Sequence, residues 1–137
     1  MEWHEIENDA DLARLNELYG YFEDSFLVRM EYLSGDYVDS DLCGHMEQTN
    51  DLRVTFQRLD REPFSIELWF SHTKRISLFF ANPQDKRLSD ILFAKVCRND
   101  SSVFWTLWEE FDPYNPEHLE GTALIEACGL KWRIAES

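Results

Sequence analysis

Two carboxylates and a hydroxyl stand next to one another at Glu23, Asp24 and Ser25, where a helical pattern gives way to an alternating one. Paired carboxylates can separate their pKa values and share acid–base work, and His4 could complete a hydrolytic group with Glu23 and Asp24. The alternative is a turn, because Asp and Ser side chains bind nearby backbone amides. We favour the turn. The sequence has no nucleophile elbow, phosphate loop or HExxH motif, so we expect a protein that is not an enzyme.

Cysteine and histidine, which often bind metals in proteins, are widely spaced in this chain. The nearest approach to a metal pair is Cys43 with His45, in a polar stretch rich in aspartate. A structural zinc site needs three or four ligands, and the remaining cysteines, Cys97 and Cys128, are far away in the sequence. We therefore expect no metal site and no cofactor.

One stretch mixes aromatic and acidic residues in a way that suits protein recognition. It runs from residue 108 to 120, WEEFDPYNPEHLE, and its two prolines predict a surface loop. Aromatic side chains anchor interfaces, and carboxylates attract a basic partner. The alternative is a solvated loop whose Trp108 and Phe111 enter the core. The candidate residues for partner binding are Trp108, Glu109, Glu110, Asp112, Tyr114 and Glu117.

Two further aromatic residues, Trp69 and Phe79, stand out of pattern in the central strands. They belong to the face opposite Leu68 and Leu78. Either the N-terminal helix covers them, or they form an apolar patch that binds a second copy of the chain. We favour the helix and keep a homodimer as the alternative.

The stretch from Asp51 to Asn82 is expected to form the scaffold that positions these side chains. Three runs in it alternate apolar and polar residues, which is typical of strands with one face on a core. Turn signals at residues 60–63 and 71–74 have hairpin length, so the pattern predicts a three-stranded antiparallel meander. The apolar positions of the three runs are Leu52, Val54 and Phe56; Phe64, Ile66, Leu68 and Phe70; and Ile76, Leu78 and Phe80.

The flanking segments complete the expected fold. Asn8 is a good N-cap, and leucines at helical spacing predict a helix over residues 9–19 that Gly20 ends. Strands are expected at 26–32, 91–96, 103–108 and 121–134, of which 91–96 is central and the last is kinked or bulged at Gly129. Residues 34–50 are expected to be mostly loop, with Tyr37 and Val38 as candidate strand residues, and 82–86 a turn or longer loop. The order predicts one α+β domain over residues 1–137: an N-terminal helix on a curved, mainly antiparallel sheet of about seven strands, approaching a sandwich or half-barrel.

The chain is acidic, with 27 Asp and Glu against 13 Lys and Arg and a net charge of −14. This charge disfavours binding to nucleic acid or to an anionic membrane, and it would speed association with a basic protein. The alternative is that it only keeps the protein soluble. The acidic N-terminus is unlike an export signal, no apolar run approaches the ~20 residues of a membrane helix, and three cysteines suggest a reducing compartment. We expect a cytoplasmic protein.

Several short motifs follow one another along the chain. They are W-x-x-I at residues 3–6, F-x-D-S at 22–25, L-R-V-x-F-Q at 52–57, I-E-L-x-F at 66–70 and W-R at 132–133. This order resembles small uncharacterised bacterial single-domain proteins, some of which are similar to immunity proteins of polymorphic toxin systems. The resemblance implies a toxin-neutralising role and carries over no functional residues.

The expected function is a non-enzymatic acidic domain that binds a protein, with toxin neutralisation as its sharpest form. One alternative is a small-ligand or hydrolytic domain that uses the concave face of the sheet. The other is a structural module that associates with itself.

Overall fold

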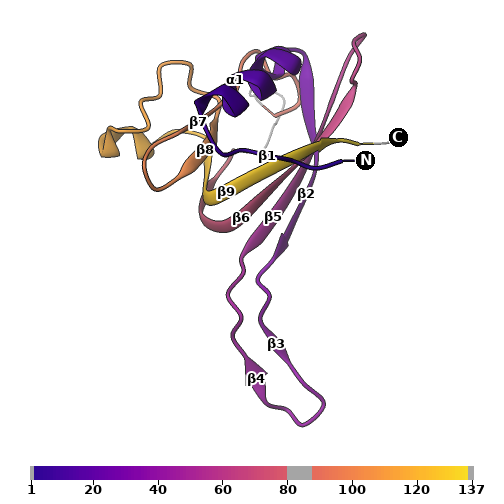
Figure 1. The fold of residues 1–137 in the computed structure, drawn as a ribbon, viewed down its shortest axis with the longest axis vertical. Helices are drawn as coiled ribbons and strands as arrows, with labels where there is room; N and C mark the ends of the chain where they lie inside the picture. The colour runs from indigo at the N-terminus through magenta and orange to yellow at the C-terminus, as the bar shows by residue number, and fades with distance from the viewer. Residues whose placement is uncertain (1, 80–87, 136–137) are drawn as a thin grey trace.

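The chain forms a strongly curved antiparallel sheet with one α-helix against its concave side (Figure 1). These features come from a computed structural model that describes residues 2–79 and 88–135. The predicted α+β fold, with one N-terminal helix on a curved sheet of about seven strands, is confirmed. The elements are β1 (His4–Glu5), α1 (Asp9–Leu18), η1 (Gly20–Phe22), β2 (Ser25–Leu33), β3 (Tyr37–Val38), β4 (Gly44–His45), β5 (Asp51–Arg58), β6 (Ser65–Ser77), β7 (Lys95–Arg98), β8 (Val103–Thr106), η2 (Pro116–Leu119) and β9 (Leu124–Ile134).

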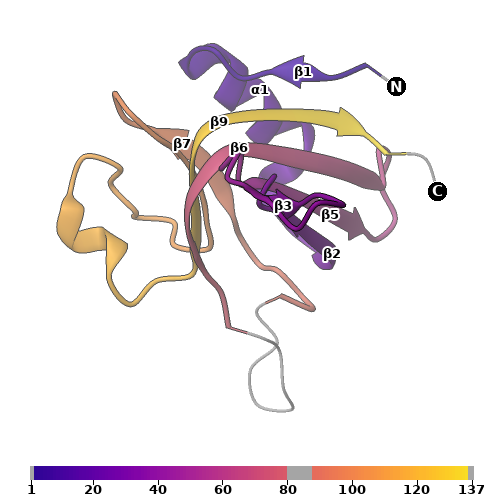
Figure 2. The same ribbon diagram turned by 90° about the horizontal axis from the view of Figure 1, so that it is seen from below.

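The seven-stranded sheet has the order β2-β5-β6-β9-β8-β7, and β1 also pairs with β9. The long strands β6 and β9 bend together (Figure 2), so that the first part of β9 pairs with β8 and the last part with β1. The prediction of a turn at residues 71–74, and with it of a third strand in the meander, is wrong, because β6 runs without a break from Ser65 to Ser77. This segment continues β6 through a bulge, with a register shift between Thr73 and Arg75 and a positive φ at His72. An extra residue in one strand bends it and increases its twist.

The core fills the inside of this bend. Apolar side chains from β5, β6, β8 and β9 meet Leu12, Leu15 and Tyr19 of the N-terminal segment in one buried cluster. Phe22 contacts Phe56 and, on the other half of the sheet, Trp105, with ring centroids 5.0 and 6.1 Å apart. Burying such large side chains stabilises the fold by roughly 1.5–3 kcal/mol each. The aromatic cluster therefore holds the two halves of the bent sheet together.

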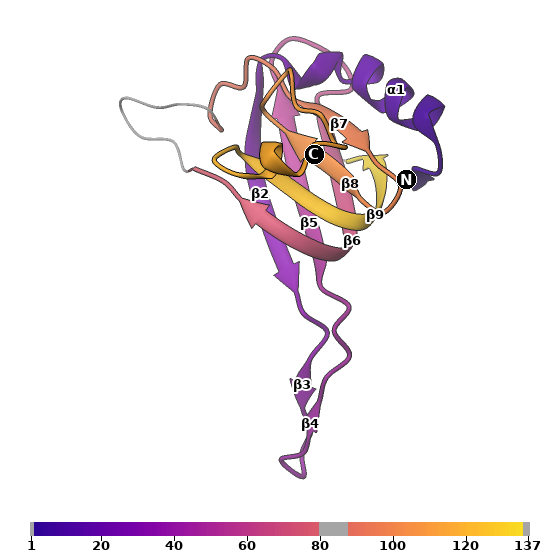
Figure 3. The same cartoon turned by 90° about the vertical axis from the view of Figure 1, so that its left-hand side faces the viewer.

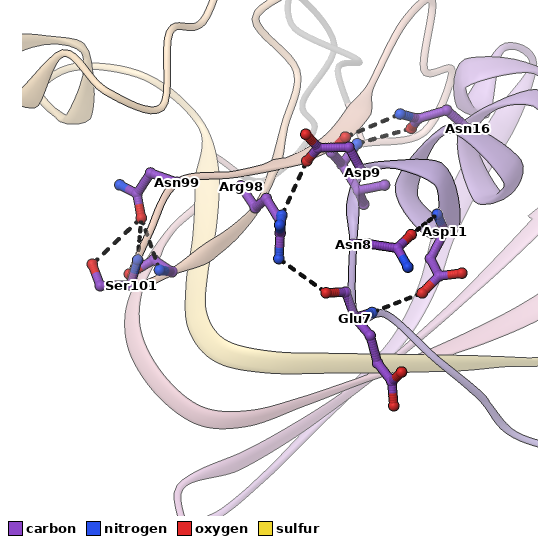
Figure 4. A network of polar contacts seen from close by, with 10 residues as sticks. Glu7, Asn8, Asp9, Asp11, Asn16, Arg98, Asn99 and Ser101 are labelled. Atoms are coloured by element: carbon purple, nitrogen blue, oxygen red, sulfur yellow. Dashed lines mark hydrogen bonds and ion pairs between the residues drawn. The ribbon is translucent and has the colours of Figure 1, made fainter.

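Helix α1 begins and ends close to the predicted residues. The Asn8 side chain accepts a hydrogen bond from the Asp11 amide at 2.9 Å, as an N-cap does, and Arg98 pairs with Asp9 at 3.0 Å (Figure 4). At the other end, Gly20 has a φ of +56° that glycine adopts without strain. The helix is thus tied to the sheet as well as capped.

The strand expected at residues 91–96 is found at 95–98, and it is an edge strand and not a central one. The buried Asn16 side chain exchanges two hydrogen bonds with the backbone of Val96, at 2.9 and 3.0 Å (Figure 4). The Asn16 side chain therefore takes the place of a strand partner at this edge, while Leu92 of the predicted strand is 79% exposed. Ile91 makes only an isolated bridge to Ser25. The turn expected at residues 82–86 and the side chain of Phe80 lie outside the described residues.

Candidate protein-binding surfaces

A hairpin arm, residues 34–50, projects from the body of the protein (Figures 1 and 3). It continues the β2–β5 pair and carries the two-stranded sheet of β3 and β4, paired at Tyr37 with His45 and at Val38 with Gly44. The expectation that most of this stretch is loop, with strand at Tyr37 and Val38, is confirmed, because only residues 37–38 and 44–45 form strand. The sequence did not predict that these two strands pair into a hairpin, whose two faces are both open to solvent.

The base of the hairpin arm is tied to the sheet. The Tyr32 hydroxyl donates to the Asn50 side chain at 2.7 Å, and the Asn50 amide donates to the Ser34 carbonyl at 3.1 Å. The amide of His72, in the bulge of β6, donates to the Thr49 carbonyl at 3.1 Å. The bulge thus supports the arm, and the arm has a defined direction relative to the body.

The tip of the hairpin arm is organised around Asp39. One carboxylate oxygen accepts hydrogen bonds from the amides of Asp41 and Cys43, at 2.9 and 3.0 Å. The other lies 2.7 Å from His45 Nε2, and the His45 ring stacks on Tyr37 with centroids 4.5 Å apart. These contacts, that of His45 first, lower the pKa of Asp39. The tip is therefore a folded turn.

The outer surface of the hairpin arm is apolar and acidic together. Leu42 and Met46 are 86% and 80% exposed. The arm holds four acidic residues and no Lys or Arg, and within the described residues no donor or cation contacts the carboxylates of Asp41 and Glu47. Exposed apolar side chains on a projecting element make this surface a candidate for protein binding, and its unpaired carboxylates would favour a cationic partner. The remaining exposed apolar residues of the arm are Tyr37 and Val38.

The expected partner-binding loop, between β8 and β9, is anchored to the body on one side. Phe111 is 3% exposed and packs on Phe104, and Trp108 lies on the His118 ring with centroids 4.3 Å apart. Lys95 Nζ donates to the carbonyls of Glu109 and Phe111, at 2.8 and 3.0 Å. Trp108 and Phe111 thus pack against the body, as in the alternative prediction of a solvated loop whose two aromatic residues enter the core. Glu109, Glu110, Asp112, Tyr114 and Glu117 are exposed.

Trp69 lies on the convex face of the sheet, so the expectation that the helix covers it is wrong. The ring of Trp3 packs edge-on against it, with centroids 5.4 Å apart. Lys131 Nζ and the Arg53 guanidinium lie over the Trp69 ring, 4.3 and 4.9 Å from its centroid. Cations over aromatic faces stabilise such a cluster. Trp69 is therefore covered by neighbours of its own chain.

The convex face also carries an ion-pair network centred on Glu67. Arg53 binds the Glu67 carboxylate through two hydrogen bonds of 3.1 Å, and Arg133 binds it through one of 2.9 Å. Phe79, the second residue of the expected self-association patch, follows the other end of β6, beyond the bulge, and is 43% exposed. Trp69 and Phe79 therefore do not form one continuous patch. Self-association of the chain stays a prediction.

The alternative catalytic residues are separated by the sheet. His4, on β1, stacks on Trp132 of β9 with ring centroids 4.5 Å apart. Glu23 and Asp24 precede β2, and β5 and β6 stand between β2 and β9. Adjacent strands are about 4.8 Å apart, which leaves several strand spacings between the imidazole and the two carboxylates.

The cavity beside His4 likewise lacks the alternative catalytic carboxylates. It has a volume of about 230 Å³. Glu5, Asp11 and Arg14 line it together with Trp3 and Trp132, whereas Glu23 and Asp24 do not. In the described part of the chain, no three His, Cys, Asp or Glu residues are placed to hold a metal ion.

Comparison of the chain with family models, with curated proteins and with solved structures found no match. No helix among the described residues is both long and apolar enough to cross a bilayer. The resemblance to immunity proteins therefore stays a prediction, and the function must be argued from the two acidic surfaces themselves.

Proposed function

We propose that this protein is a non-enzymatic binding module that recognises a basic protein partner through its hairpin arm. The observation that carries the proposal is the arm itself, a braced hairpin that extends away from the body and is exposed at Leu42 and Met46. A hairpin built to pack within its own fold would bury such side chains. An apolar tip next to unpaired carboxylates instead fits a partner surface that has an apolar recess beside lysines and arginines.

Charge and order support this use of the hairpin arm. The net charge of −14 raises the rate of encounter with a basic partner. Because the tip is already folded around Asp39, little conformational entropy is lost when it binds. The exposed acids of the loop between β8 and β9 extend the negative surface on the body and contribute to steering.

In its sharpest form, the proposal is that the protein neutralises a toxin in the cytoplasm. A projecting acidic hairpin could enter the active-site cleft of a basic enzyme and block it. The resemblance of the short motifs to those of immunity proteins agrees with this role, and it supplies no residue of its own to the argument.

The test is capture of partners from a native lysate at low and high salt, with three forms of the protein. The first is the wild type, the second carries Asp41→Asn and Glu47→Gln in the hairpin arm, and the third is a matched control with Glu109→Gln and Glu110→Gln in the loop. We expect a stoichiometric basic partner that is lost at high salt and with the arm variant, and is retained by the control. Equal capture by all three forms would contradict the proposal.

A further inference from the structure

Strand β2 is an edge strand of the main sheet, and part of its outer side is open. It stands first in the order β2-β5-β6-β9-β8-β7. At its start, the Ser25 carbonyl accepts a hydrogen bond from the Ile91 amide at 2.9 Å. The Leu27 amide likewise donates to the Leu88 carbonyl at 3.0 Å. Beyond Leu27, no described strand pairs with the outer side of β2, and an open edge of this kind is a template on which another chain can pair.

The register of β2 shows which of its backbone groups face the open edge. The two residues that bond outward lie opposite alternate residues of β5, beginning at Arg58. In an antiparallel pair every second residue points its amide and carbonyl away from the partner strand. Past the register shift in β2, this alternation continues to Val54, which lies opposite Met30, and then to Leu52, which lies opposite Tyr32. The amides and carbonyls of Met30 and Tyr32 therefore point toward the open edge.

A groove with mostly apolar walls runs along the same edge. It has a volume of about 390 Å³, and its apolar lining comes from Leu27, Val28, Met30, Leu78 and Leu88. Residues directly opposite one another in an antiparallel pair project to the same face, so Met30 shares its face with the buried Val54. Met30 is nevertheless 36% exposed. The groove is thus an uncovered margin of the core, which a strand added beside β2 would cover.

The charges on either side of Met30 complement a second copy of the same strand. Arg29 and Glu31 form a loose pair of 3.6 Å within the chain, and their side chains are 72% and 42% exposed. If two copies of β2 run antiparallel with Met30 opposite Met30, Arg29 of each copy lies opposite Glu31 of the other. Opposite charges in such positions attract and like charges repel. A register with Met30 opposite Tyr32 would instead place Glu31 opposite Glu31.

We propose that the protein forms a two-fold symmetric dimer in which the β2 strands of two copies pair antiparallel, centred on Met30. A two-fold interface uses the same surface of both copies, as this register does. The surface is separate from Trp69 and Phe79, and the dimer goes beyond the binding of a basic partner.

The dimer leaves both hairpin arms open. Each arm follows directly after β2 (Figure 3), so the arms of two antiparallel copies point in opposite directions. Leu88 and Ile91 already occupy the edge beside residues 25–27, which limits the pairing to residues 28–32. Such an interface is small, and the dimer is therefore expected at high protein concentration and in exchange with the monomer.

The test is sedimentation velocity of the full chain from micromolar to near-millimolar concentration. An ionic strength of about 0.15 M screens the repulsion between distant charges of the two acidic copies. We expect a reversible equilibrium of monomer and dimer. Arg29→Glu should raise the dissociation constant at least about tenfold, because both facing pairs change from attraction to repulsion. The matched control is Arg14→Glu, which makes the same change in net charge at an exposed position of α1 and should dimerise as the wild type does.

A charge swap makes the test specific to the proposed register. The double variant with Arg29→Glu and Glu31→Arg again places opposite charges across the two-fold axis, and it should recover the dimer. In the wild type, hydrogen exchange at the amides of Met30 and Tyr32 should slow as the dimer forms. A monomer at every concentration would overturn the proposal, and so would a dimer that Arg29→Glu does not weaken or that the double variant does not recover.

Discussion

Replacing Glu67 by Gln tests whether the convex face of the sheet is a structural network. The Glu67 side chain is 14% exposed, and the side chains of Arg53 and Arg133 are 28% and 32% exposed. Three charge-assisted hydrogen bonds converge on its carboxylate. Glutamine removes the negative charge, keeps one acceptor oxygen, and leaves two guanidinium groups close to each other. A hydrogen bond to a charged group contributes about 1.5–3 kcal/mol, and glutamine keeps part of the hydrogen-bond geometry. We therefore expect the free energy of unfolding to fall by about 2–3 kcal/mol.

The assay is urea unfolding followed by tryptophan fluorescence, with calorimetry as a second measure. For a domain of this size the loss corresponds to a decrease in Tm of roughly 6–10 °C. Glu31→Gln is the matched control, because Glu31 lies 3.6 Å from Arg29 in a pair whose side chains are 42% and 72% exposed, and such surface pairs contribute about 0–1 kcal/mol. If Glu67→Gln costs no more than Glu31→Gln, the reasoning on the convex face is refuted.

Three further outcomes follow from individual contacts. Gly129→Ala should lower stability by about 1–3 kcal/mol in urea unfolding, because its Cβ would lie 2.6 Å from Ser71 Oγ; adding Ser71→Ala should recover most of the loss, and no recovery would refute the clash. Burial raises the pKa of Cys97 to about 11, so at pH 8 a thiol reagent should modify the exposed Cys43 and Cys128 quickly and the half-buried Cys97 much more slowly; equal rates for the three thiols would contradict this. The pKa of Asp39 is lowered, first by its hydrogen bond to His45. Its contribution to the hairpin arm is therefore present above its unfolded pKa of about 3.9 and is lost as the pH falls through the lower folded value. The amide signals of the tip should report that loss, and tip signals that stay unchanged when Asp39 is protonated would contradict it.

The sequence predicted those parts of the fold that have a buried face. Alternation in β5 and in the first half of β6, and the cap at Asn8, follow from local rules that the tertiary structure does not override. The bulge of β6 was mistaken for a turn because polar residues interrupt alternation in the same way in both. Only the pairing with β9, from a distant part of the chain, decides between them. The edge position of β7 was missed for a similar reason, since Asn16 replaces a strand partner.

The pairing within the hairpin arm was not predicted, although the largely loop character of residues 34–50 and the strand at Tyr37 and Val38 were. A two-stranded ribbon that is open on both faces has no core to impose alternation, so no strand period revealed β4 as the partner of β3. The acidic character of its surface could be read from the sequence, because residues 1–50 hold 13 acids against two arginines. The loop acids were correctly placed on the surface, whereas the inward position of Phe111 depends on contacts with Phe104 that the local sequence does not show.

The central claim, that the hairpin arm binds the partner, is tested most directly by photo-cross-linking from single positions. A photoreactive phenylalanine analogue is placed at Leu42, which is 86% exposed on the arm, or at Tyr114, which is 65% exposed on the body loop. In native lysate at low salt, we expect position 42 to form one dominant cross-link to a basic protein that high salt abolishes, and position 114 to form little of it. Cross-linking from position 114 without position 42, or from neither, would contradict the account.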